Sequence, residues 1–123
     1  MNPDVKTKWV AALRSGEYKQ GTEHLHSGDS FCCLGVLCDL YAKEHPANGK
    51  WELVRNDVFE FRNAAGVGAV QILPRDVVKW AKLPDSNPMI RRLSPPRIFH
   101  CIADLNDDGM SFSDIADLIE KQL

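Results

Sequence analysis

The sequence predicts an α+β fold, in which about five helices pack around a central apolar helix at residues 31–44, with a small antiparallel sheet at residues 51–73. The central helix is predicted by the run FCCLGVLCDLYA, in which Asp39 is the one charged residue. A surface helix would carry a polar face, so a run that is apolar all round is expected to be buried. The sheet is predicted by three short segments with alternating apolar residues, which is typical of strands.

The composition indicates a single compact domain that covers residues 1–123. Hydrophobic residues make up 44% of the chain and charged residues 26%, as in ordinary globular proteins. The formal net charge of −2 argues against a globally basic nucleic-acid-binding surface. The start MNPDVKTKW lacks the apolar core of a secretory signal, and no run is long enough to span a membrane. We therefore expect a cytoplasmic protein whose four cysteines are free thiols.

The first helix is expected to begin at Asn2, which can cap its N-terminus, and to end at Gly16. Its core-facing residues recur with the helical period: Val5, Trp9, Ala12 and Leu13. Two short extended segments are expected within residues 18–26, where Leu25 is buried between two exposed histidines.

The central helix is expected to start after Asp29 or Ser30, because either residue can serve as its N-cap. Leu34, Leu37 and Leu40 are expected to be largely buried. Gly35 lies one turn into the helix, and its missing side chain lets another backbone approach closely.

Strands are expected at residues 51–54, 58–62 and 69–73, joined as an antiparallel meander. A short helix is expected to follow Pro74 and to end near Lys82. Its inner side is expected to carry apolar residues: Val77, Trp80 and Ala81.

Two further helices are expected near the end of the chain, capped by Ser94 and Ser111. The buried stripe of the first is expected to consist of Ile98, Cys101, Ile102 and Leu105. The apolar face of the second is expected to consist of Phe112, Ile115, Ala116, Ile119 and Leu123.

Three segments resemble a family of small uncharacterised proteins found in bacteriophages, prophages and bacterial genomes. They are YKQG with the FCCLGVLCDLY that follows, LPRDVVKWAKLP, and LNDDGMSFSDIADLIE, and they cover under half of the chain. The resemblance brings no assigned activity and no catalytic residues. It implies a small, phage-encoded accessory protein in the cytoplasm of a bacterial host cell. Such proteins often counter host defence by binding a signal or a host protein.

A cysteine-dependent hydrolase or transferase is one alternative function. Cys32 and Cys33 fall in the first turn of the predicted central helix, where the helix dipole stabilises a thiolate and lowers its pKa. The candidate bases are His24, His26 and His100, and the candidate orienting residues are Asn106 and Asp104. The same cysteines are more typical of small hydrophobic residues in a buried helix, and this interpretation is favoured over the nucleophile.

We expect no metal and no cofactor. Cys33 and Cys38 do not share a helix face, and the sequence has no C-x-x-C motif. Residues 104–109 match the opening of an EF-hand loop, D-x-N-x-D-G, but Ile115 stands where the bidentate Glu belongs. The last two helices resemble the start of a helix-turn-helix unit, yet their acidic residues would repel DNA.

The favoured function is non-enzymatic binding, or sequestration, of a small phosphorylated or nucleotide-like ligand. Two helix N-termini and an arginine group could hold the phosphate. The candidate binding residues are Gln20, His24, Ser30, Cys32, Trp51, Trp80, Arg91, Arg92 and Arg97. A second alternative is an inhibitor that binds a host protein. The oligomeric state is left open, with a homo-oligomer among the options.

Overall fold

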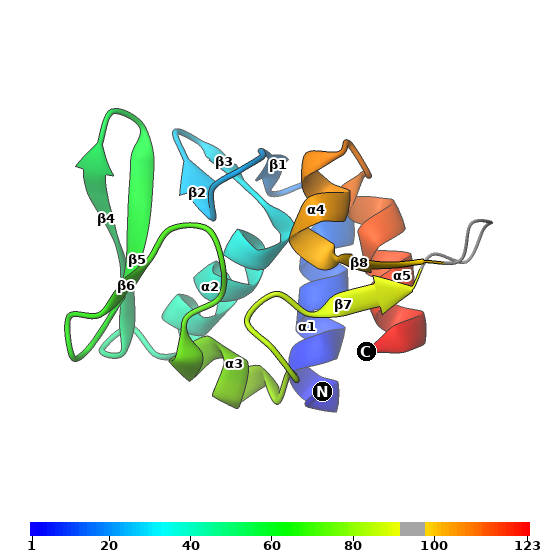
Figure 1. Ribbon diagram of the computed structural model, residues 1–123. Helices are drawn as coiled ribbons and strands as arrows, with labels where there is room; N and C mark the ends of the chain where they lie inside the picture. The colour runs from blue at the N-terminus through cyan, green and yellow to red at the C-terminus, as the bar shows by residue number, and fades with distance from the viewer. Residues whose placement is uncertain (92–97) are drawn as a thin grey trace.

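The computed structural model describes residues 1–91 and 98–123. Within these residues the chain forms five helices, a six-stranded mixed sheet and a two-stranded antiparallel sheet, so the predicted α+β class is confirmed. The middle of the molecule is formed by helices α1 (Pro3–Arg14), α2 (Cys33–Glu44) and α5 (Phe112–Gln122). Strands β4 (Gly49–Arg55) and β5 (Val58–Asn63) lie at its left end in Figure 1. The small sheet of β7 (Met89–Arg91) and β8 (Phe99–Cys101) lies at the opposite side, in front of α1 and α5.

The two terminal helices pack against each other and form as expected. Helix α1 (Pro3–Arg14) is capped by Asn2, whose Oδ1 accepts hydrogen bonds from the backbone N–H groups of Asp4 and Val5. Helix α5 (Phe112–Gln122) is capped by Ser111, whose Oγ accepts from the N–H of Asp114 at 3.1 Å. The apolar stripes of both helices face the core.

Helix α2 (Cys33–Glu44) is the buried helix that its apolar run predicts. Leu34 and Leu37 are fully buried, and Leu40 is half-buried against the core. The expected N-cap is wrong: Cys32, rather than Asp29 or Ser30, precedes the first helical residue. Ser30 and Phe31 are held extended by strand pairing, so the helix can begin only after them.

The six-stranded sheet has the order β1-β3-β2-β5-β4, with β6 also pairing with β5. Its strands are β1 (Lys19–Gln20), β2 (His26–Ser27), β3 (Ser30–Phe31), β4 (Gly49–Arg55), β5 (Val58–Asn63) and β6 (Gly68–Ala69). The sheet is therefore larger than the meander expected at residues 51–73, and it is mixed because β1 and β3 run parallel. The third expected strand, residues 69–73, is wrong beyond Ala69, where the chain leaves the sheet.

Helix α3 (Arg75–Ala81) follows Pro74 as expected, and Lys82 ends it in the left-handed conformation. The expected helix capped by Ser94 begins at residues 94–97, outside the described residues. Its continuation over 99–101 is wrong, because β8 (Phe99–Cys101) pairs there with β7 (Met89–Arg91).

Helix α4 (Ile102–Asp107) starts after this pairing ends. Its first N–H groups are bound by the preceding loop: Ile102 donates to the carbonyl of Pro88 and Ala103 donates to Asn87 Oδ1. Ile102 and Leu105 are buried as expected, whereas Ile98 is 48% exposed. The periodic stripe was therefore correct only from Ile102 onward.

Candidate functional site

The cysteines at the start of α2 are buried thiols. Cys32 and Cys33 are 3% and 0% exposed. Burial raises the pKa of Cys32 to about 11, against a partial lowering by the N–H of Gly35, and it raises the pKa of Cys33 well above its ordinary value. The negative charge of Asp107 adds to both pKa shifts. The expected lowering of the thiol pKa by the helix dipole is therefore wrong, because desolvation outweighs it.

The candidate bases do not join these thiols. His24 lies in the loop between β1 and β2, and His100 lies on β8. In the part of the chain that the structure describes, neither imidazole forms a hydrogen bond with Cys32 or Cys33. Cys32 Sγ instead accepts from the N–H of Gly35 at 3.4 Å, and so works as the cap of α2.

Gln20 and Asn106 form a partly buried amide pair that links β1, α2 and α4 with the turn before α5. Gln20 Nε2 donates to Asn106 Oδ1 at 3.0 Å and to the carbonyl of Met110 at 2.7 Å. Asn106 Oδ1 also accepts from the N–H of Cys33 at 3.2 Å, and its Nδ2 donates to the carbonyl of Gly21 at 2.8 Å. The polar atoms of Gln20 are thus engaged in linking β1 to α2 and to the α4–α5 turn, and not in contact with a ligand.

The two tryptophans and Ser30 also have partners inside the chain. Trp51 Nε1 donates to Asp39 Oδ1 at 3.2 Å, and Ser30 Oγ donates to the carbonyl of Ser27. Trp80 packs edge-on against Tyr41, with ring centroids 5.3 Å apart. A carboxylate beside Trp51 disfavours a phosphate at that ring.

Arg91 lies on β7, away from Trp51. Its backbone N–H and carbonyl both bond the side chain of Gln122 at the end of α5. Strand β7, which carries Arg91, and strand β4, which carries Trp51, lie at opposite sides of the molecule (Figure 1). Arg92 and Arg97 lie outside the described residues. Of the described members of the predicted nucleotide site, Gln20, Ser30 and Cys32 lie together where β1 pairs with β3 and α2 begins, whereas Arg91 lies in the separate β7–β8 sheet.

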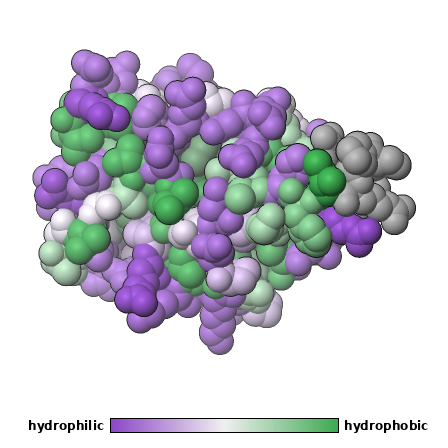
Figure 2. Space-filling model, viewed as in Figure 1, coloured by the Kyte–Doolittle hydropathy of each residue, from purple (hydrophilic) through white to green (hydrophobic). Residues whose placement is uncertain are grey.

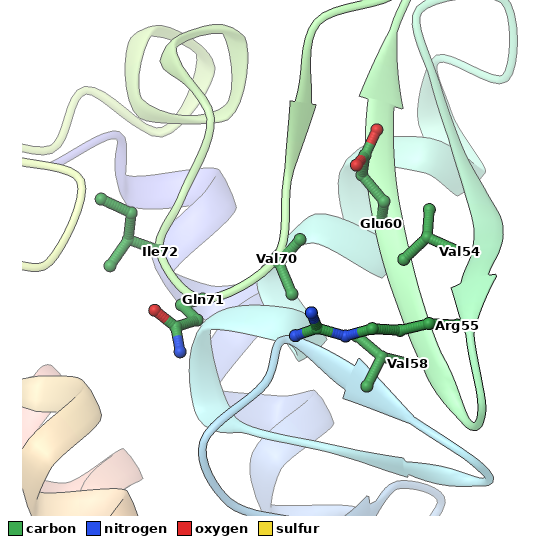
Figure 3. Close-up of a pocket in the computed structure, with 7 residues that line it drawn as sticks. All are labelled: Val54, Arg55, Val58, Glu60, Val70, Gln71 and Ile72. Carbon is green, nitrogen blue, oxygen red and sulfur yellow. The ribbon is translucent and has the colours of Figure 1, made fainter.

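The structure instead has an open hollow beside the β4–β5 hairpin (Figure 3). Its volume is about 650 Å³, and it is lined by Val54, Arg55, Val58, Glu60, Val70, Gln71 and Ile72. The segment at residues 70–72 forms one wall and the hairpin forms the other. In Figure 2, hydrophobic residues reach the surface between hydrophilic ones over this end of the molecule.

Two charged residues line the hollow, and within the described residues Glu60 has an ion-pair partner whereas Arg55 has none. Arg62 Nε lies 2.7 Å from Glu60 Oε1 and 2.8 Å from Glu52 Oε2, so the charge of Glu60 is countered. Arg55 forms no ion pair within the described residues, and its side chain extends along the hollow toward Gln71 (Figure 3). The hollow thus combines aliphatic walls with one available guanidinium.

The lining residues of this hollow were not selected from the sequence. Strand alternation places Val58 and Glu60 on the face opposite Phe59 and Phe61, so Val58 could have indicated an apolar residue on the outer face. The path of residues 70–72 could not be predicted, because the third strand was expected to continue there.

The acidic stretch at residues 104–109 forms the end of α4 and the turn that follows it. Asp107 Oδ1 accepts hydrogen bonds from the N–H of Glu23 and from Asn106 Nδ2, and Gly109 has a φ of +100°. Among residues 1–91 and 98–123, no group of three acidic, histidine or cysteine residues has a metal-binding arrangement.

Within the same residues, no helix has both the length and the apolar character needed to cross a membrane.

Comparison with known proteins identifies a family. The family model described as "Domain of unknown function (DUF8296)" matches residues 1–123. No curated protein and no solved structure matches the chain. Because the family match covers every residue, the chain belongs to the DUF8296 family of domains of unknown function.

Proposed function

We propose that this protein binds, without chemical turnover, a small anionic ligand with an apolar body, of which a phosphorylated small molecule is the favoured kind. The observation that supports this proposal is the Arg55 guanidinium, which shares an aliphatic hollow with four valine and isoleucine side chains. An arginine can hold a phosphate with two parallel hydrogen bonds. The volume of about 650 Å³ is in the range of ligand pockets.

The hollow favours an aliphatic or phenyl-like body over a nucleobase. Neither Trp51 nor Trp80 lines it, so it offers no tryptophan ring for base stacking. Binding without turnover is favoured because Cys32 and Cys33 are buried and their raised pKa values keep both thiols protonated at neutral pH. Sequestration of a phosphorylated signal by a phage-encoded protein, as a counter to host defence, is the biological role that we propose.

Thermal-shift measurements with four probes test this function. Butyl phosphate and phenyl phosphate should raise the melting temperature more than inorganic phosphate or adenosine monophosphate, because only the first two suit both the guanidinium and the aliphatic walls. Arg55→Ala should abolish this shift. Arg55 is exposed, so the melting temperature of the unliganded variant should stay close to that of the wild type.

Arg75→Ala is the matched control, because Arg75 is also exposed but lies at the start of α3, outside the hollow. It should keep the full ligand-induced shift. Equal loss in both variants would refute the assignment to the hollow. If a probe is recovered chemically altered, and this alteration requires Cys32, the result would support the cysteine enzyme instead.

Protein binding is the second candidate function. Strand β4 is at the edge of the six-stranded sheet, and Leu53 and Val54 near its end are 60% and 42% exposed. An edge strand with exposed apolar side chains is a common docking site for another chain.

A further inference from the structure

Strand β4 has one paired and one open edge. It pairs with β5 from Gly49 to Arg55, and it ends the strand order of the sheet. In Figure 1, no other element lies beyond β4 on its outer side. Within the described residues, no backbone group of residues 50–55 forms a hydrogen bond other than those of the β4–β5 pairing. The open edge therefore presents N–H and carbonyl groups that another strand can satisfy.

The regular part of this edge is symmetric about Trp51. The pairing register shifts between Leu53 and Arg55, which marks a bulge that interrupts the strand there. The residues before the bulge, Gly49 to Leu53, are centred on Trp51. If two copies pair antiparallel about Trp51, Lys50 of each copy lies directly opposite Glu52 of the other.

The charges of the hairpin suit this register. Arg62 is shared between Glu52 and Glu60, so one guanidinium faces two carboxylates. Lys50 is exposed and forms no ion pair within the described residues. Opposite charges on directly paired residues stabilise a sheet, and like charges destabilise it. A register centred on Glu52 would instead oppose the two Glu52 carboxylates.

The apolar residues suit the same register on the other face. Leu53, which is 60% exposed, would lie opposite Gly49 of the second copy. Gly49 has no side chain, and the ring of Phe61 occupies the space where its β-carbon would be. Gly49 itself is buried, so the Leu53 side chain would lie close to the aromatic ring that covers it, and the two half-buried Trp51 residues would lie opposite each other.

From this complementarity we infer that β4 is a self-association edge. Two copies of the chain join antiparallel through Gly49–Leu53 about a two-fold axis at Trp51, which extends the sheet across both copies. Two Lys50–Glu52 pairs and two Leu53–Gly49 contacts fix the register. The contact is isologous, so it closes as a dimer and does not propagate into a filament.

Sedimentation equilibrium of the full chain tests this inference. The wild type should show a concentration-dependent mass that approaches twice 13.8 kDa. Lys50→Glu places like charges opposite each other twice and should raise the dimer dissociation constant about tenfold or more. The double variant Lys50→Glu with Glu52→Lys restores opposite charges across the two-fold axis and should recover dimerisation relative to Lys50→Glu.

Lys121→Glu is the charge-matched control, because Lys121 is exposed on α5, away from β4, and its variant should dimerise like the wild type. Circular dichroism confirms that each variant is folded. A wild type that stays monomeric at all concentrations, or a dimer that Lys50→Glu leaves unchanged, would overturn the inference. Arg55→Ala should leave the dimer intact, so failure of the dimer and failure of ligand binding can be told apart.

Discussion

The carbonyl oxygen of Leu25 occupies the space that a β-carbon at Gly35 would need. The same oxygen accepts a hydrogen bond from the N–H of Cys32 at 3.2 Å, so the segment before β2 lies directly against the first turn of α2. This contact confirms that Gly35 allows the close approach of another backbone. It also explains a glycine inside a helix, where alanine would have the higher helix propensity.

Gly35→Ala is expected to destabilise the protein by about 1–3 kcal/mol, because the new methyl group meets backbone atoms that cannot move independently. The gain in helix propensity, about 1 kcal/mol, offsets only part of this cost. Urea denaturation followed by circular dichroism measures the change. A midpoint equal to or above that of the wild type would contradict the close approach.

Leu37→Ala is expected to reduce the free energy of unfolding by about 2–5 kcal/mol, because it leaves a cavity in the core. Leu37 is fully buried at the centre of α2. Val67→Ala is the control, since Val67 is 62% exposed and its truncation should change stability by less than about 0.5 kcal/mol. Similar denaturation midpoints for the two variants would show that α2 is not the core helix.

Asn106→Ala is expected to cost about 1–3 kcal/mol or more, because it leaves the N–H of Cys33 and the amide of Gln20 without their buried acceptor. Asn106 is 1% exposed, so water cannot replace it without rearrangement. Chemical denaturation measures the loss. Asp108→Ala is the control, because Asp108 lies two residues away and is exposed, so its truncation should have a small effect on stability. An equally small effect for Asn106→Ala would refute the structural role of the Gln20–Asn106 pair.

Stability is expected to fall as the pH rises from about 9 to about 11. The pKa of Cys32 is about 11 in the folded state against an ordinary value of 9.0, so the unfolded chain loses its thiol proton first. Above pH 9 the unfolded state therefore binds fewer protons, and the free energy of unfolding decreases with pH. Cys32→Ser should flatten this dependence in urea titrations under reducing conditions. An unchanged slope in the variant would contradict the raised pKa.

The sequence determined the helical framework because its signals are local or periodic. The apolar run of α2 leaves no polar face for solvent, which predicts burial in any fold. Asn2 and Ser111 cap their helices through oxygen atoms within three residues of the N–H groups that they bind. Such contacts are set by the chain itself, so they could be predicted without knowledge of the neighbouring elements.

The tertiary structure decided what depends on residues that are distant in sequence. Phe99–Cys101 is a strand because Met89–Arg91 lies beside it, although its own pattern suits a helix. The hollow exists because residues 70–72 leave the sheet and pass beside the hairpin, which places Val70 and Arg55 around one space. The cysteine pKa values rise because surrounding side chains remove water from α2, and this desolvation outweighs the local helix dipole.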